Sequence, residues 1–423
     1  MPILNKASKV KFWLSLYVFI FVFDPPFLPL DPIYLIGLIT FFYVGLHSNQ
    51  YKWPTDLDHY KNFIVHLFIY FLLIITLNFF VNTSDSLLLN SLRCINASFI
   101  LTLIELFCVL FVIKTSERKG LGLNDIYDIL LWAGILQSLF ALIAFVLPGV
   151  REIFLTFAKG DMYSNEYFLE RRGYGFAMNL VDTYGYAIGL IAGCMLIAGR
   201  LTRLKKIIFL ILLIFCTFVN SRTGLAIIII GIVFSVFKVR SSTILVKRLF
   251  WGGIIGCFVF FIILPLLFDY ALNSQQETLK WVASDFNKIY TLLIGNQINE
   301  PIDFISTRVG PPQEFFQFFF GSGHSVYGTK RVLGFATDIG YINLWWMYGI
   351  VGMSVLFLQL IILFTKAFRY AVRSEEKVII FFLAITYFMM LEKANLLGYN
   401  PGTCVVYLLL FSILYFKHIK RYG

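Results

Sequence analysis

The stretch IIFLILLIFCTFVNSRTGLAIIIIGIVFSVF, residues 207–237, places one apolar run on each side of the short polar segment NSRTG. Helices that cross the hydrocarbon core of a membrane are built from such continuous apolar runs. The polar segment contains Arg222, although a charge near hydrocarbon costs from about 3 to more than 10 kcal/mol. The pattern therefore predicts two membrane helices joined by a tight turn, and it raises the question of what Arg222 contributes there.

The same pattern of apolar runs extends along the whole chain. Of its 423 residues 59% are hydrophobic and only 14% are charged, whereas soluble domains carry about a quarter charged residues. The runs are continuous and do not alternate with polar residues, which excludes a strand barrel. We therefore expect an all-α polytopic membrane protein that forms one domain over residues 1–423, with about twelve transmembrane helices. The expected spans are residues 12–29, 31–46, 62–81, 87–113, 126–147, 179–199, 205–220, 222–237, 248–268, 336–365, 378–392 and 401–416.

The positive charges predict how these spans are oriented. With the N-terminus inside, 23 of the 35 Lys and Arg residues fall in short cytoplasmic segments, as the positive-inside rule requires. Both termini are then cytoplasmic. Nine of the remaining cations lie in two predicted periplasmic loops, 148–178 and 269–335, in which we expect short helices. A surface helix is expected over 275–293, where apolar residues recur at helical spacing.

Arg222 lies between two spans at the predicted periplasmic face. Asn220, Ser221 and Thr223 supply polar neighbours, and Gly224 marks a break. A helix that starts here would present free N–H groups beside a guanidinium, which is an arrangement that binds anions. The alternative is an arginine at a helix end that extends to the membrane interface.

Two further groups of residues are predicted at the same face. Arg171 and Arg172, in ERRGYGFAMN (170–179), form a cationic approach to the span at 179–199 or, alternatively, a solvated charge pair. His324 and Asp338 flank the entry to the span at 336–365. Either could accept a proton from a hydroxyl group, but His324 could also be a surface loop residue and Asp338 a helix N-cap.

The chain has no nucleotide-binding loop, no HExxH zinc motif and no Cys/His ligand spacing. We therefore expect no cofactor, no metal and no ATP-driven transport. Glu105 is an acidic residue in the middle of a predicted span, and it either pairs with a neighbouring helix or has a function of its own. The periplasmic set predicts arginines that hold an anionic leaving group and a base that activates an acceptor.

The motifs RRGYGFAMN, NSRTG, FGSGHS and TDIGYINLWWMYGIVG, in this order, resemble the O-antigen polymerase (Wzy) family, and the chain is similar to the related O-antigen ligases. The resemblance implies a C-type glycosyltransferase-like arrangement in the bacterial inner membrane, with a periplasmic active face. It implies a metal-independent glycosyltransferase that moves a growing glycan from undecaprenyl pyrophosphate to the non-reducing end of another lipid-linked repeat unit. The implied partners are the undecaprenyl-pyrophosphate-linked oligosaccharide, membrane lipid and a chain-length regulator protein, and no nucleic acid.

By motif, Arg172 and Arg222 match arginines that hold pyrophosphate in the related ligases. The ligase histidine corresponds in place to Asp338, a difference that favours a polymerase and leaves His324 and Asp338 as alternative bases. An O-antigen ligase acting on lipid A core is one alternative function. A lipid-linked oligosaccharide flippase or other transporter is another, although a transporter should carry its charges in a central cavity reachable from both faces.

Overall fold

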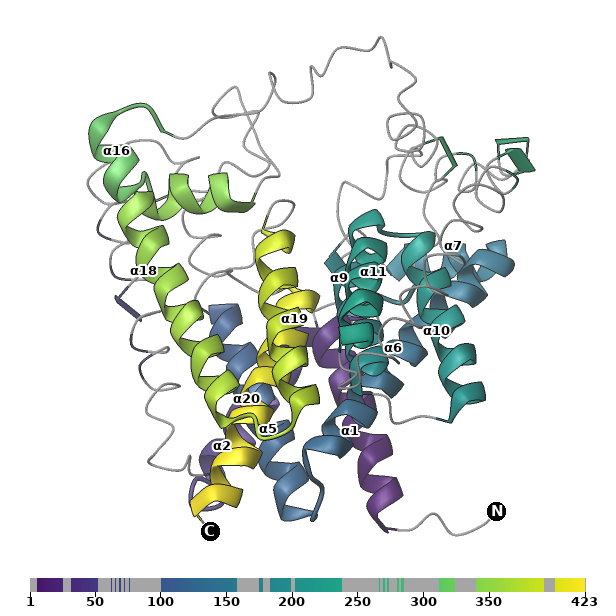
Figure 1. Cartoon of the computed structure of the whole chain (residues 1–423), viewed down its shortest axis with the longest axis horizontal. Coiled ribbons are helices and arrows are strands. Elements are labelled where there is room, and N and C mark those ends of the chain that lie inside the picture. The colour runs from purple at the N-terminus through teal and green to yellow at the C-terminus, as the bar shows by residue number, and fades with distance from the viewer. Residues whose placement is uncertain are drawn as a thin grey trace. The chain divides into compact units, whose positions relative to one another are not determined.

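The described part of the chain is helical and contains no strand in the computed structural model (Figure 1). The structure describes residues 6–25, 32–51, 62, 65, 68, 69, 72, 76, 100–157, 175–177, 183–198, 202–237, 266, 269, 270, 272, 273, 280, 283, 284, 312–323, 340–391 and 400–422. The helices are α1 (Lys6–Phe23), α2 (Pro32–Leu46), α5 (Leu101–Arg118), α6 (Leu123–Val146), α7 (Pro148–Phe157), α9 (Thr183–Ala198), α10 (Arg203–Phe218), α11 (Arg222–Phe237), α16 (Phe315–Phe320), α18 (Gly340–Tyr370), α19 (Ser374–Met390) and α20 (Pro401–Tyr422).

Several of these helices are compatible with membrane spans. A helix occurs at ten of the twelve predicted spans, and the other two, 62–81 and 248–268, lie largely outside the described residues. Two of the described helices, α6 and α18, are long and apolar enough to cross a membrane, and four shorter apolar helices accompany them. The fold is therefore compatible with an α-helical membrane protein, whereas the number of spans and their orientation stay predictions.

The chain divides into two compact units. Unit 1 comprises residues 1–24, 29–133 and 308–423, and unit 2 comprises residues 25–28 and 134–307. Helix α6 begins in unit 1 and continues into unit 2. The sequence alone predicted a single domain and did not indicate this division.

Helix α20 forms the core of unit 1. Every residue from 401 to 415 is buried, and α1, α5, α18 and α19 all contact it. Asn400 caps its start, because its Oδ1 atom accepts a hydrogen bond of 2.9 Å from the backbone N–H of Gly402. A helix that is apolar on all sides can be buried on all sides, which explains the central position of α20.

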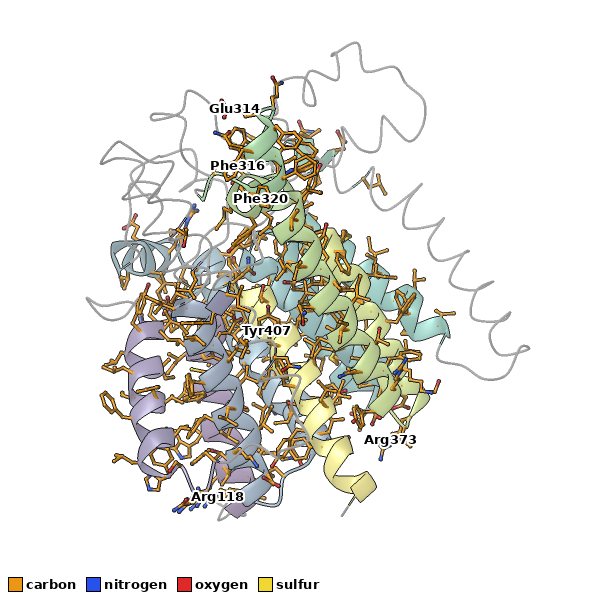
Figure 2. The ribbon with its side chains drawn as sticks, turned by 90° about the vertical axis from the view of Figure 1, so that its left-hand side faces the viewer. Arg118, Glu314, Phe316, Phe320, Arg373 and Tyr407 are labelled. Carbon is orange, nitrogen blue, oxygen red and sulfur yellow. The ribbon has the colours of Figure 1, made fainter. Side chains whose placement is uncertain are left out.

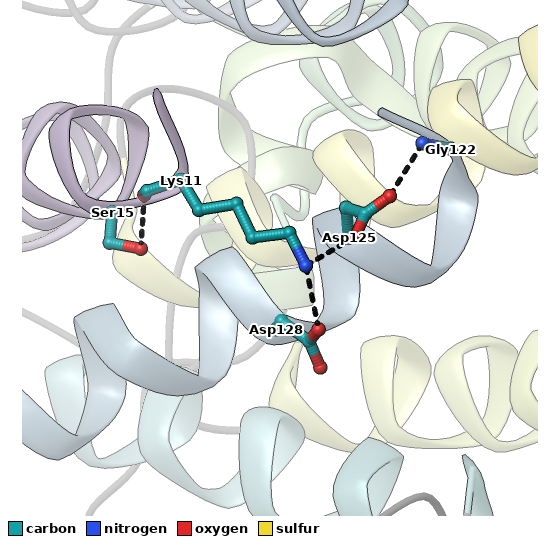
Figure 3. Close-up of polar contacts among 5 residues, drawn as sticks. All are labelled: Lys11, Ser15, Gly122, Asp125 and Asp128. Carbon is teal, nitrogen blue, oxygen red and sulfur yellow. Dashed lines mark hydrogen bonds and ion pairs between the residues drawn. The ribbon is translucent and has the colours of Figure 1, made fainter. Parts of the chain in front are cut away.

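An ion-pair cluster connects the first two turns of α1 with the first two turns of α6 (Figure 3). Lys11 forms ion pairs with Asp125 and, at 3.4 Å, with Asp128. Asp125 also accepts a hydrogen bond of 2.7 Å from the backbone N–H of Gly122. Burial disfavours the charged form of Lys11, but the two carboxylates outweigh it and raise the pKa of Lys11. The lysine is therefore held as a cation at the start of α6.

A second polar cluster connects the end of α5 with α20. Lys114 donates a hydrogen bond to the hydroxyl of Tyr415, and that hydroxyl donates one of 2.5 Å to Glu117. Burial lowers the pKa of Lys114, an effect that Glu117 partly offsets. Lys114 lies just beyond the predicted span 87–113. One turn further on, Arg118 lies over the ring of Tyr51 at 5.7 Å.

Helix α18 is interrupted at Gly349, where φ is +66° and ψ is 177°. Helix α18 coincides with the span predicted over 336–365, but the sequence did not indicate that residues 340–348 form a separate helical segment. The carbonyl of Phe319 lies against Gly349 and leaves no room for a side chain. Glycine alone adopts this backbone region readily, so the break requires a glycine at position 349. The 21 residues that follow, 350–370, are enough to cross a membrane.

The two ends of unit 1 differ in character (Figure 2). Arg118 and Arg373 lie at one end, and Phe316 and Phe320 of α16 lie at the other, with Tyr407 between them. Both phenylalanines are exposed. Helices α7 and α16 fall within the predicted loops 148–178 and 269–335, so the expectation of short helices in these loops is confirmed. The predicted surface helix 275–293 lies mostly outside the described residues.

Candidate functional site

The NSRTG segment forms the turn between α10 and α11, and the helix predicted to start there begins at Arg222. Asn220 Nδ2 donates a hydrogen bond of 2.9 Å to the carbonyl of Cys216, which holds it against the end of α10. Ser221 Oγ accepts one of 3.1 Å from the backbone N–H of Gly224 and caps the start of α11. Arg222 is therefore the first helical residue, although its side chain lies outside the described atoms.

Glycines bring α9 and α11 into close contact beside this turn. A Cβ atom on Gly189 would lie 2.6 Å from the carbonyl oxygen of Gly224, and one on Gly231 would lie 2.5 Å from the Cα of Gly193. Gly185, one turn before Gly189, lies against Ser221. Small residues allow backbones to approach in this way in membrane helix pairs. The contacts advance in the same direction along both helices, so α9 and α11 are parallel and fix the position of the turn.

Helix α6 supplies two buried polar residues to the same region. Gln137 and Ser138 are fully buried, and Ser138 Oγ donates a hydrogen bond of 2.8 Å to the carbonyl of Gly134. The thiol of Cys216 lies within hydrogen-bonding reach of both Ser138 and Asn220. These contacts connect α6 with the turn that precedes Arg222.

The RRGYGFAMN motif also meets α6. A Cβ atom on Gly175 would lie 2.8 Å from the Cδ atom of Gln137 and 3.0 Å from its carbonyl oxygen, so a larger residue would displace the Gln137 amide. The ring of Phe176 contacts Phe140 and Phe154, with centroid distances of 5.5 and 4.9 Å. Gly175 and Phe176, in the middle of this motif, thus pack against α6. Arg171 and Arg172, three and four residues before Gly175, lie outside the described residues.

Two side chains in this cluster contain polar atoms without a partner. Both amide atoms of Gln137 and the Oδ1 atom of Asn220 are buried and make no hydrogen bond within the described part of the chain. A buried donor or acceptor left unpaired costs about 1–3 kcal/mol. The motifs at Arg172 and Arg222 were predicted from sequence, whereas Gln137 was not. Its only signal is the polar pair QS, which interrupts the apolar run ILQSLFAL at 135–142.

The two predicted bases, His324 and Asp338, lie outside the described residues, but the segments next to them are ordered. Ser322, two residues before His324, donates a hydrogen bond of 2.7 Å from its backbone N–H to the carbonyl of Trp346. The indole N–H of Trp345 donates one of 2.9 Å to the carbonyl of Phe318. Within unit 1, the FGSG segment is thus bound to the first part of α18, the helix that begins two residues after Asp338.

Glu105 of α5 is fully buried beside Cys404 of α20. The ion pairs of the described residues do not include it. Both alternatives for this carboxyl group, pairing with a neighbouring helix and a separate function, therefore stay open. The described residues contain no group of three or more His, Cys, Asp or Glu side chains placed to hold a metal ion.

In the described residues, the fold and these contacts define a helical protein with apolar helices compatible with membrane spans, and with a buried polar cluster on α6, on α10 and in the turn before α11. The comparisons with known proteins add no name to this description, because no family model, no curated protein and no solved structure matches the chain.

Proposed function

We propose that the protein is a glycosyltransferase of the bacterial inner membrane that polymerises lipid-linked oligosaccharide repeat units. The proposal rests on one observation: two separate arginine motifs, RRGYG and NSRTG, have contacts that lead to neighbouring residues of α6. Gly175 lies against Gln137, and the thiol beside Asn220 lies against Ser138. Two cationic segments held on one helix suit the two phosphates of a polyprenyl pyrophosphate.

In the proposed reaction, a hydroxyl oxygen of the acceptor sugar forms a bond to C1 of the donor sugar. The bond between C1 and the pyrophosphate oxygen breaks, and the electron pair leaves with the pyrophosphate. The hydroxyl proton passes to a base, for which His324 and Asp338 are the candidates. Arg171, Arg172 and Arg222 hold the leaving group. Their positive charge binds pyrophosphate more strongly as negative charge develops on it, and this lowers the barrier without a metal.

The charge distribution in unit 1 supports a periplasmic active face. Arg118 and Arg373, predicted to be cytoplasmic, lie at the end opposite to α16, which belongs to the predicted periplasmic loop 269–335 (Figure 2). The predicted site motifs all belong to the periplasmic face in this scheme, an asymmetry that favours an enzyme over a transporter.

The test replaces Arg172 and Arg222 separately by lysine. Lysine keeps the charge but loses the bidentate guanidinium fork, so we expect about a 10²–10³-fold loss of polymerisation rate. Lipopolysaccharide gels should show core with a single repeat unit and little long-chain glycan. Core without any repeat unit in a deletion strain would indicate a ligase or a flippase instead.

Arg118→Lys is the matched control, because it makes the same exchange at the end of unit 1 that is predicted to be cytoplasmic (Figure 2). It should leave the long-chain glycan unchanged. Normal glycan length in Arg222→Lys, at normal protein level in the membrane, would contradict the proposed role of Arg222.

A further inference from the structure

Gln137 and Asn220 stand out among the buried polar side chains of unit 2 because each has hydrogen-bonding capacity that the described residues do not use. Gln137 is 0% exposed and Asn220 is 1% exposed. The Nδ2 atom of Asn220 is occupied by the carbonyl of Cys216, which leaves Oδ1 as its free atom. Both Nε2 and Oε1 of Gln137 are free.

The free atoms define what could bind to them. An amide oxygen only accepts hydrogen bonds, whereas an amide nitrogen only donates them. The set of free atoms therefore comprises two acceptors and one donor group. Ionised pyrophosphate offers acceptors alone, so it cannot satisfy either amide oxygen. A sugar carries hydroxyl groups that donate and accept, and it can satisfy all three atoms.

The positions of the two amides relate them to the arginines. Asn220 is two residues before Arg222, and Gln137 lies against Gly175, which follows Arg172 by three residues. Gly175 has no side chain, so it brings only backbone atoms next to the amide of Gln137. Neutral amides thus occur beside both cationic motifs and on different helices.

We propose that Gln137 and Asn220 bind the sugar residue that is bonded directly to the lipid pyrophosphate, while the arginines hold the pyrophosphate itself. This inference rests on the proposed function, and it assigns sugar recognition to one residue on α6 and one in the turn before α11. A merely structural role explains the three unpaired amide atoms less well, because the large majority of buried side-chain polar atoms have a hydrogen-bond partner.

The experiment measures binding to the purified full chain in detergent by native mass spectrometry. The probes are sugar-free polyprenyl pyrophosphate and the same lipid carrying N-acetylglucosamine or galactose. The wild-type protein should bind at least one sugar-bearing probe about 10-fold more tightly than the sugar-free lipid. Gln137→Met keeps the length of the side chain but removes its polar atoms, so it should reduce this preference by about 5- to 10-fold.

The sugar-free probe should bind to Gln137→Met within about 2-fold of the wild-type affinity, since the arginines are unchanged. Asn220→Ala provides a second variant with the same expected loss of preference. Ser412→Ala is the control, because Ser412 is a buried residue of α20 whose hydroxyl also lacks a partner in the described part of the chain. It should keep the full preference.

The outcomes separate this inference from the proposed function. An unchanged sugar preference in Gln137→Met and in Asn220→Ala would overturn the inference, as would a wild-type protein that binds all probes equally. In both cases, the proposed pyrophosphate site would still be supported if Arg222→Lys binds the sugar-free lipid more weakly than the wild-type protein does. A wild-type protein that binds none of the probes would overturn the proposed function, and the inference with it.

Discussion

The close contact of α9 with α11 gives the sharpest test of the architecture around Arg222. In Gly189→Ala, the new methyl group would lie 2.6 Å from the carbonyl oxygen of Gly224 and 3.2 Å from its Cα atom, whereas ordinary contact begins at 3.4 Å. These are backbone atoms, so no side-chain rotation can relieve the clash. The two helices must separate by roughly 1 Å, and overpacking of this kind costs about 1–3 kcal/mol.

Gly45→Ala is the matched control. Gly45 lies in α2, and a Cβ atom there would meet nothing within 4 Å. Both substitutions gain the same helix propensity, up to about 1 kcal/mol. The difference between the two variants therefore isolates the clash, and it should be about 1–3 kcal/mol. The measurement is the free energy of unfolding of the purified protein in a mixed-micelle denaturant titration.

The same substitution also tests the link to function. Gly224 is two residues after Arg222, so a displacement of the first turn of α11 also moves Arg222, which is proposed to bind pyrophosphate. A shift of about 1 Å can reduce an enzymatic rate by about 10²-fold. Equal stability of Gly189→Ala and Gly45→Ala would refute the packing argument. Reduced stability with normal glycan length would refute the connection to Arg222 alone.

Three further predictions concern single residues. Gly349→Ala should destabilise the protein by at least about 2 kcal/mol in the same titration, because its backbone region is restricted to glycine and the carbonyl of Phe319 leaves no space. Burial lowers the pKa of Lys114 from its ordinary 10.5. Between the lowered value and 10.5 the unfolded chain holds a proton that the folded chain lacks, so stability should rise with pH through this window, and Lys114→Met should lack the rise. Gln137→Met should raise the melting temperature, since it removes unpaired buried atoms that cost about 1–3 kcal/mol; a lower melting temperature would indicate that the amide has a structural partner.

The local features of the fold could be predicted from sequence where the pattern is strong. The helix start at Arg222 was predicted because a short polar segment with a glycine separates two apolar runs. The break at Gly349 was not predicted. GIVG lies within an unbroken apolar run, and the backbone conformation of Gly349 depends on its contact with Phe319, a residue that is distant in sequence.

The candidate site shows the same division between local and long-range information. The arginine motifs are visible because charge is rare in this chain. Gln137 is uncharged and lies in the middle of a helix, so its sequence context gives little indication of a role. Only its contact with Gly175 identifies it, and that contact joins residues from different parts of the chain.

The combination of residues near Arg222 is difficult to explain by stability alone. Apolar side chains at positions 137 and 220 would remove the cost of unpaired amide atoms, and the glycines of α9 and α11 already hold the helices together. Proteins retain such costly groups mainly at sites where function requires them. The arginines can bind the charged part of a lipid-linked sugar, but a guanidinium only donates hydrogen bonds. Acceptors for sugar hydroxyl groups must therefore come from other residues, and the free oxygens of Gln137 and Asn220 supply them.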